Sequence, residues 1–140
     1  MTISISHDHV GLSVTPEDLD ATIQWYTSTL GFIVERRFDV HGQTFAFIVR
    51  DGVKIELVAG AAEPHTAMPD SIATSHTIER LHHFCVAVED LDAIVAQVRD
   101  RGVPLIGGPM EVPVIGQRIA FITDNLGNII EFTEPGTRRG

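Results

Sequence analysis

The second half of the chain repeats the first at a nearly constant distance, and this internal repeat limits the possible folds more than any other feature. A histidine opens an apolar run at His9 and does so again 74 residues later, at His83. Ala-Phe-Ile at 46–48 returns at 120–122, and Ile-Glu-Leu at 55–57 returns 75 residues later as Ile-Glu-Phe. We therefore predict one domain over residues 1–140, with modules at about 5–60 and 80–134 and a linker at about 61–79.

Each module has the pattern of a strand, a helix and three further strands. Thr15 and Pro16 suit the start of a first helix and Asp90 the start of a second. Apolar residues then fall on one face of each helix, namely Leu19, Ile23, Tyr26 and Leu30, and then Leu91, Ile94, Val95 and Val98. The β-rich segments that follow lie at about 32–39, 44–50 and 53–59, and at about 103–106, 117–123 and 128–133, separated by turn signals such as Gly-Gly-Pro at 107–109. The expected fold class is α+β, with two tandem βαβββ modules around a strand-lined cleft.

The composition excludes several classes of function. Ten basic residues stand against 19 acidic ones, and the formal net charge of −9 argues against nucleic acid or an anionic membrane as a partner. No apolar run approaches the roughly 20 residues of a transmembrane helix, and residues 1–8 lack a signal-peptide pattern. The only cysteine, Cys85, cannot form an intramolecular disulfide. We expect a cytoplasmic protein that acts on a small molecule.

The repeat places four metal-ligating residue types at equivalent positions. His9 and His83 open the first strand of their modules, and Glu56 and Glu131 lie in the last strand. Side chains alternate along a strand, so each glutamate faces away from its apolar neighbours and needs either solvent or a cation. Two imidazoles and two carboxylates suit Zn, Ni, Co, Mn or Fe(II), so we predict one divalent metal ion at these four residues.

These motifs resemble the vicinal oxygen chelate superfamily, which includes glyoxalases, bleomycin-resistance proteins and dioxygenases. The resemblance covers nearly all of the chain and rests on five stretches: Asp8 to Val14, Trp25 to Phe32, Ile55 to Leu57, His82 to Asp92 and Asp124 to Glu131. It implies paired βαβββ modules around a U-shaped cleft. It also implies that His9, Glu56, His83 and Glu131 are the metal ligands.

The complete set of four ligands favours one branch of this family. Glyoxalase I and methylmalonyl-CoA epimerase are the members with two histidines and two acids, and in them the metal stabilises the anion formed when a proton leaves the carbon next to a carbonyl. The resemblance implies that Glu56 and Glu131 act as base and acid in an isomerase, epimerase or lyase. Two alternatives stay open. One is an Fe(II) dioxygenase that uses His9, His83 and Glu131 as a facial triad, and the other is a non-catalytic antibiotic-binding resistance protein.

Further residues are candidates for the substrate side of the site. Gly11, Ser13 and Cys85 follow the histidines on the same strand face, where Cys85 is also explained as a small core residue. Phe47 and Phe121 are candidate cleft walls or core residues, and Arg118 is a candidate anchor for a carboxylate or phosphate. His82 is expected to point away from His83, and His7 and His41 to have surface roles. The resemblance also implies a homodimer.

Overall fold

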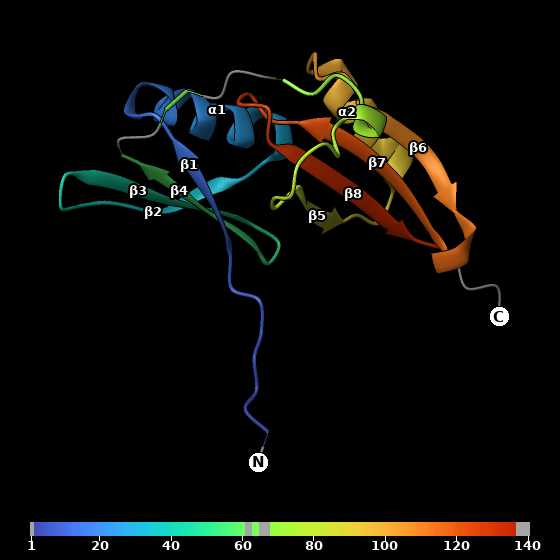
Figure 1. The fold of residues 1–140 in the computed structure, drawn as a ribbon, viewed down its shortest axis with the longest axis horizontal. Helices are drawn as coiled ribbons and strands as arrows, with labels where there is room; N and C mark the ends of the chain where they lie inside the picture. Colours follow the sequence, from blue (N-terminus) through green and yellow to red (C-terminus); the bar gives the residue numbers. More distant parts are fainter. Residues whose placement is uncertain (1, 61–62, 65–67, 137–140) are drawn as a thin grey trace. The chain divides into compact units, whose positions relative to one another are not determined.

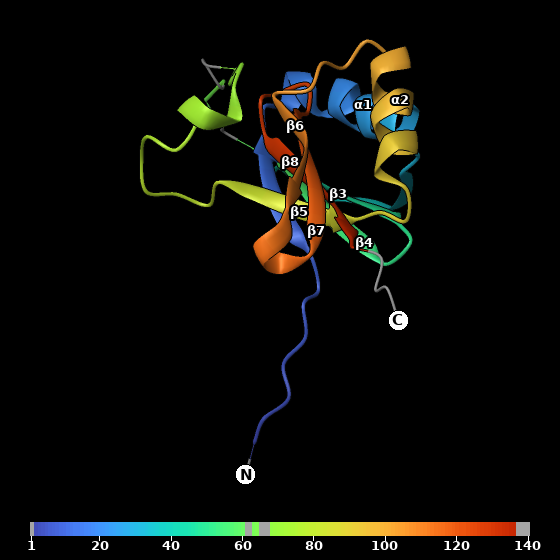
Figure 2. The same cartoon turned by 90° about the vertical axis from the view of Figure 1, so that its right-hand side faces the viewer.

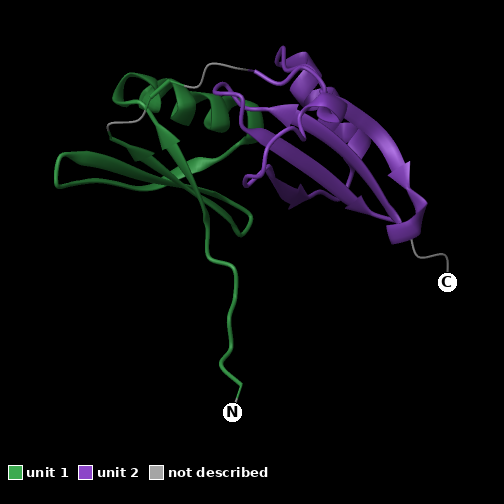
Figure 3. Ribbon diagram, in the orientation of Figure 1, with its two compact units in different colours: residues 1–64 green, residues 65–140 purple. Residues whose placement is uncertain are grey.

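The computed structural model describes residues 2–60, 63–64 and 68–136, which fall into two compact units, Met1–Pro64 and His65–Gly140 (Figure 3). In the first unit the elements are β1 (Val10–Val14), α1 (Leu19–Leu30), β2 (Ile33–Val40), β3 (Gln43–Arg50) and β4 (Val53–Ala59). In the second they are β5 (His83–Ala87), α2 (Leu91–Asp100), β6 (Gly107–Val112), β7 (Gln117–Thr123) and β8 (Ile129–Pro135). The predicted βαβββ order is confirmed in both units.

Both units build the same four-stranded sheet, with strand orders β1-β4-β3-β2 and β5-β8-β7-β6 (Figure 1). In each sheet the first strand runs parallel to the last one, and the other neighbours are antiparallel. The strand that begins just after His9 and the strand that begins at His83 are therefore each hydrogen-bonded to the strand that carries the glutamate. None of the helices in the described part of the chain is long and apolar enough to span a membrane.

The helix α1 begins and ends where its local sequence predicts. The Thr15 side chain accepts a hydrogen bond from the backbone N–H of Asp18 at 3.2 Å and closes a 3₁₀ turn at Pro16–Asp18 before the α-helix proper. Gly31, with φ of 72°, ends the helix in the left-handed conformation that favours glycine. Leu19, Tyr26 and Leu30 are buried, as the predicted apolar face requires.

The helix α2 follows the same rules. The Asp90 carboxylate accepts from the backbone N–H of Ala93 at 3.0 Å, so Asp90 is the N-cap. The helix lies along one face of the β5–β8 sheet (Figure 2), and its residues Leu91, Val95 and Val98 are buried. The helix does not cover the opposite face of this sheet, which we call the open face of the unit.

One predicted strand was wrong. The segment 103–106 is not a strand, and β6 begins at Gly107, inside a Gly-Gly-Pro run whose composition is typical of a turn. The pairing of β6 with β7 shifts between Gly107 and Met110, which marks a bulge in this edge strand. Gly108 has φ of 74°, and a Cβ there would lie 2.5 Å from the Ile119 carbonyl oxygen. Glycine fits this backbone conformation at the bulge without a steric clash.

The hairpins before β4 and β8 differ by one residue. Asp51 and Gly52, both with positive φ, form a two-residue turn between Arg50 and Val53. In the second unit the N–H of Asp124 donates to the Asn128 carbonyl, which leaves three residues in the turn. The buried Asp124 carboxylate accepts from the N–H groups of Leu126 and Asn128, each at 2.9 Å, and fixes this turn. The extra residue explains why the repeat distance grows from 74 to 75 before the glutamates.

Part of the predicted linker packs on the second unit. Ile72–Thr74 forms a 3₁₀ turn, and the N–H of Ile72 donates to the Ile106 carbonyl at 2.8 Å. A Cβ at Gly107 would lie 2.5 Å from the Ile72 side chain, so this turn lies directly against the start of β6. Residues 61–62 and 65–67 of the predicted linker lie outside the described residues.

The core of the second unit gives a first prediction. Leu91 is fully buried, so Leu91→Ala leaves a cavity under α2 and lowers the free energy of unfolding by about 3 kcal/mol. Val114 is 90% exposed, and Val114→Ala is the matched control, with an expected change within about 0.5 kcal/mol. Urea unfolding monitored by circular dichroism measures both, and equal stability of the two variants would contradict the assigned core.

Candidate functional site

Glu56 lies in a row of aligned residues that crosses the first sheet. Glu56 pairs with Gly11 of β1 on one side and with Phe47 of β3 on the other, and Phe47 pairs with Arg36 of β2. We call these four residues the Glu56 row. Ile55 and Leu57, the neighbours of Glu56 along β4, are fully buried. Alternation along the strand therefore places the Glu56 side chain on the opposite, open face.

His9 reaches the Glu56 row from the residue just before β1. Its Nε2 lies 3.8 Å from Glu56 Oε1, and its ring meets Phe47 edge to face at 5.7 Å. Its Nδ1 lies 2.7 Å from Asp8 Oδ2. The hydrogen bond with His9, followed by the charge of Lys54, lowers the pKa of Asp8, so this carboxyl group is ionised at neutral pH.

The second sheet repeats this arrangement. Glu131 pairs with Cys85 of β5 and with Phe121 of β7, and Phe121 pairs with Gly107 of β6. These four residues form the Glu131 row. His83 Nε2 lies 3.1 Å from Glu131 Oε1, and the His83 ring meets Phe121 edge to face at 5.8 Å. Each unit thus brings one predicted imidazole and one predicted carboxylate together, with a phenylalanine ring beside them.

The distances within these pairs can be compared with those of metal ligands. Two ligands that are each about 2.1 Å from one ion lie about 3.0–3.4 Å apart at ordinary coordination angles. The second pair, at 3.1 Å, falls in this range, and the first, at 3.8 Å, lies a few tenths of an ångström beyond it. In the described part of the chain, no three or more His, Cys, Asp or Glu side chains gather into a group that could hold a metal ion. Each unit by itself therefore supplies two donors.

His82 lies closer to the site than the sequence suggested. We expected it to point away from His83, but the two rings are joined by their Nδ1 atoms at 2.9 Å. Its Nε2 lies 2.8 Å from the hydroxyl oxygen of Ser75, which the sequence did not single out. Burial lowers the pKa of His82, and neighbouring positive charge, at His76 above all, lowers it further.

Cys85 is exposed and lies beside Glu131 on the face away from the helix, so the prediction of a small core residue was wrong. Desolvation of the sulfur raises the pKa of the thiol to about 12, with contributions from the charge and hydrogen bonding of Glu131. The thiol is therefore protonated at neutral pH. In that state it is a poor nucleophile and a poor metal ligand.

The open face of the first sheet is also aromatic and partly cationic. The rings of Phe38 and Phe45 stack at 5.3 Å, and Phe38 lies 6.1 Å from Phe47. Lys54 Nζ lies 4.5 Å from the centre of the Phe47 ring and 3.2 Å from Glu35 Oε1. Phe121 is 7% exposed, whereas Phe47 is only half-buried, so the aromatic surface is more accessible in the first unit.

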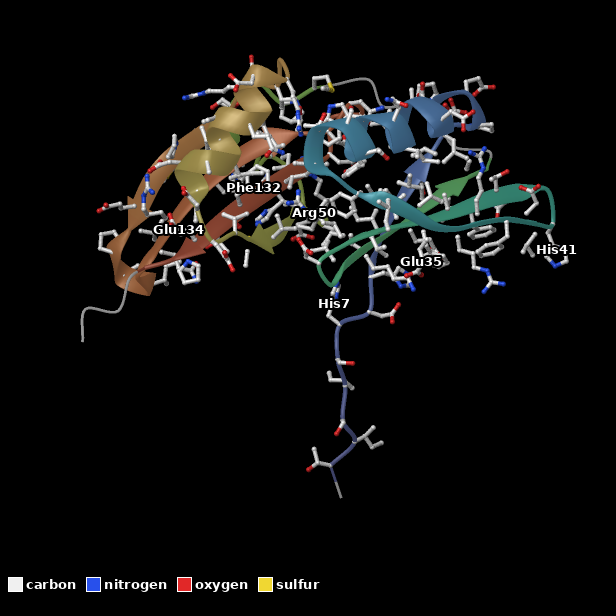
Figure 4. The ribbon with its side chains drawn as sticks, turned by 180° about the vertical axis from the view of Figure 1, so that it is seen from behind. His7, Glu35, His41, Arg50, Phe132 and Glu134 are labelled. Carbon is white, nitrogen blue, oxygen red and sulfur yellow. The ribbon has the colours of Figure 1, made fainter. Side chains whose placement is uncertain are left out.

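Arg118 does not share the face of Glu131. It pairs in register with Glu134, whereas Glu131 pairs with Phe121, and alternation puts these two sets on opposite faces of the sheet. Its guanidinium donates to Asp92 of α2 at 3.0 Å and to Glu134 at 3.1 Å; Figure 4 labels Glu134 on β8. Arg118 ties α2 to the sheet and lies on the other face from the Glu131 row.

Two other histidines lie outside both rows. His7 belongs to the extended segment before β1, and His41 to the turn between β2 and β3, where both are exposed (Figure 4). Gly11 and Ser13 are exposed on β1, on the face of Glu56. A Cβ at Gly11 would lie 3.8 Å from Glu56 Oε1, an ordinary contact, so the glycine leaves space beside the carboxylate.

Comparison with known proteins identifies relatives along nearly the whole chain. The sequence pattern of the Glyoxalase/Bleomycin resistance protein/Dioxygenase superfamily matches residues 6–132. An ethylmalonyl-CoA/methylmalonyl-CoA epimerase from Cereibacter sphaeroides is 29% identical over 120 residues, which cover 82% of this chain and 85% of the relative.

Solved structures share the fold at lower identity. A glyoxylase/bleomycin resistance protein/dioxygenase domain from Frankia sp. EAN1pec has a TM-score of 0.76 at 23% identity, over 99% of this chain and 96% of that chain. An antibiotic binding protein from Streptomyces sp. CB03234 has a TM-score of 0.68 at 23% identity, over 96% and 100% of the two chains. A glyoxalase I mutant from Zea mays has a TM-score of 0.68 at 23% identity, over 93% of this chain and 45% of that chain. The expected fold class is confirmed.

The position of Arg118 gives a second prediction. Its hydrogen bonds and charge lower the pKa of Asp92, so this ion pair stabilises the fold above the ordinary pKa of an aspartate and is lost as the pH falls through the lowered value. In Arg118→Ala the pKa of Asp92 rises towards 3.8, as measured by carboxyl ¹³C NMR. Arg99→Ala, an exposed change in the last turn of α2, is the control and leaves that pKa unchanged. An unshifted Asp92 in Arg118→Ala would contradict the pairing.

Proposed function

The chain belongs to the glyoxalase/bleomycin resistance protein/dioxygenase superfamily, and we propose that it is a divalent-cation-dependent enzyme that moves a proton next to a carbonyl group. One observation carries this proposal. The His9–Glu56 and His83–Glu131 pairs occupy the same register in two sheets of the same strand order. Each pair would supply one nitrogen and one oxygen donor to a cation.

We propose that the two pairs bind one cation together. Protein sites for Zn and similar ions use three or four protein donors, and one pair offers only two. The mixed nitrogen and oxygen set suits Zn, Ni, Co, Mn or Fe(II). Both pairs can come from one chain or from two chains of a homodimer.

The two glutamates would carry the proton. A bound cation acts as a Lewis acid that polarises the substrate carbonyl and stabilises the negative charge that develops on its oxygen. One of the two carboxylates, Glu56 or Glu131, takes the proton from the neighbouring carbon, and the other returns a proton. Gly11 and Ser13, small and exposed beside Glu56, leave room for the substrate. The relative from Cereibacter sphaeroides supports an epimerase reaction on an acyl-CoA substrate.

A second function is favoured by the aromatic surface of the first unit. Phe38, Phe45 and Phe47 form a group of neighbouring rings on the open face, suited to a planar ligand. The structural neighbour from Streptomyces sp. CB03234 is an antibiotic binding protein. In this alternative the chain binds a planar antibiotic without catalysis.

Proton exchange tests the proposed reaction directly. The protein is incubated with methylmalonyl-CoA in D₂O, and mass spectrometry measures deuterium at the carbon between the two carbonyl groups. We expect exchange that stops after metal removal with EDTA, returns with an added divalent cation and falls at least 100-fold in Glu131→Gln. Glu134→Gln is the matched control, since Glu134 lies on the same strand but on the other face, and it keeps normal exchange.

Each other outcome favours a different function. Exchange at the full rate without a cation contradicts the proposed role of the four donors. Oxygen consumption that depends on Fe(II) favours the dioxygenase reaction. Tight binding of a planar antibiotic that survives both EDTA and His9→Ala, without exchange, favours the binding protein.

A further inference from the structure

Residues 2–6, which we call the arm, have the pattern of a strand but no partner strand. Isoleucine alternates with threonine and serine along the arm, so Ile3 and Ile5 lie on one side of the extended chain. Ile3 is 85% exposed and Ile5 94%, and the arm leads away from the first unit (Figures 1 and 2). Among the described residues, the backbone of the arm has no hydrogen-bond partner. A segment that exposes both its backbone and its apolar side chains is suited to join the edge of a sheet.

The strand β2 offers an edge of this kind. It is the last strand in the order β1-β4-β3-β2, so one side of its backbone is unpaired within the sheet. Its first part is protected by a bulge between Val34 and Arg36 and by the charged side chains of residues 35–37. Its last part, residues 38–40, pairs regularly with β3, and Val40 is 42% exposed there. This last part is therefore open to a further strand.

The other edge strands fit the arm less well. The exposed residues of β1 and β5 are small, namely Gly11 and Ser13 on β1 and Cys85 and Ala87 on β5. The strand β6 contains a bulge and Pro109, whose nitrogen has no proton to donate. Of these edges, the end of β2 is the one at which two isoleucines would find large apolar neighbours.

The end of β2 has one apolar and one polar face. Phe38 lies on the open face, because it pairs with Phe45, which is two residues from Phe47 of the Glu56 row. Val40 shares this face, and Asp39 lies on the other one. The arm is divided in the same way, with its isoleucines on one face and its serines on the other.

Matching these faces determines the register. With Ser4 opposite Asp39, the two isoleucines lie beside Phe38 and Val40 in either strand direction. Pairs of aromatic and branched side chains on neighbouring strands stabilise a sheet. A shift by one residue would instead place an isoleucine beside the charged side chain of Asp39.

The arm cannot reach this edge within its own chain. The strands β1 and β2 are the outer strands of the sheet, so a strand beyond β2 lies four strand spacings, about 19 Å, from β1. Phe38 is level with Ser13, which lies about 10 Å along β1 from Val10, in the direction away from the arm. Ile5 would therefore have to lie more than about 20 Å from Val10, whereas the chain between them spans at most about 18 Å.

We propose that the arm of one copy adds as a strand to the β2 edge of a second copy, with Ile3 and Ile5 beside Phe38 and Val40. A two-fold pair uses both arms and both edges, and so closes as a dimer. The inference does not depend on the proposed function, because it uses no residue of the Glu56 row or the Glu131 row.

The oligomeric state tests the role of the two isoleucines. Light scattering is expected to give the mass of two chains, and analytical ultracentrifugation measures the dissociation constant of the dimer. We expect this constant to rise at least 10-fold in the double variant Ile3→Ser/Ile5→Ser. Ile78→Ser is the matched control, since Ile78 is 69% exposed and lies outside the arm, and it leaves the constant unchanged. A mass of one chain, or a dimer that the double variant does not weaken, overturns the proposal.

Disulfide cross-linking tests where the arm binds. All variants carry Cys85→Ser, so each introduced cysteine is the only thiol of its chain. Chains with Val40→Cys are mixed with chains that carry Ile3→Cys or Ile5→Cys, left to exchange subunits and oxidised. Opposite residues of neighbouring strands are close enough for a disulfide, and a bond between these positions can only join two copies. We expect residue 40 to bond to residue 3 if the two strands are antiparallel and to residue 5 if they are parallel.

Ser4→Cys is the control for this experiment, because the proposed register places Ser4 on the other face from Val40. Peptide mapping by mass spectrometry is expected to show at least five times less bonding of residue 40 to residue 4 than to the favoured isoleucine position. Equal bonding from all three arm positions, or no bonding from any of them, overturns the proposed register and edge.

Discussion

The parallel pairing of the first strand with the last strand of each sheet determines the geometry of both candidate half-sites. It aligns Gly11 with Glu56 and Cys85 with Glu131, and so brings a histidine from two residues earlier to the glutamate. The antiparallel neighbour then adds a phenylalanine directly opposite the glutamate. If either last strand slipped by one residue, its carboxylate would turn to the buried face beneath the helix, where it would have to lose its charge or find a partner.

The register depends on the turn before each last strand. A two-residue turn whose residues both have positive φ sets the register of β4. A three-residue turn around the Asp124 carboxylate sets the register of β8. Two different turns thus deliver the same alignment of glutamate and phenylalanine. The halves diverge around that alignment, with an accessible aromatic group in the first unit and a row partly covered by Ile72 in the second.

The element order and the faces of the glutamates could be predicted from the sequence because they rest on local signals. Helix caps at Thr15 and Asp90 and the alternation around Glu56 and Glu131 need no distant contact. The start of β6 could not be predicted, since a Gly-Gly-Pro run is typical of a turn and only its pairing with β7 shows a bulge instead. The face of Arg118 could also have been predicted from the sequence. It is three residues from Phe121, and this spacing places the two side chains on opposite faces of the strand.

The hydrogen-bond partners of the histidines were beyond a sequence pattern. His82 precedes β5, so strand alternation does not govern its side chain. It contacts both His83 and Ser75, and Ser75 follows the turn at Ile72–Thr74. Asp8 has the same relation to β1 and to His9. Such contacts depend on side-chain directions outside regular structure, which periodicity does not determine.

The central claim is that four donors from two repeated halves bind a single cation. Native mass spectrometry of the protein loaded with Zn²⁺ tests it most directly, because it counts ions per chain. The account predicts one ion per chain, bound more weakly when either Glu56 or Glu131 is replaced by glutamine. Two ions per chain, or one ion whose affinity is unchanged by the loss of one of the two glutamates, would show that the halves do not share a cation.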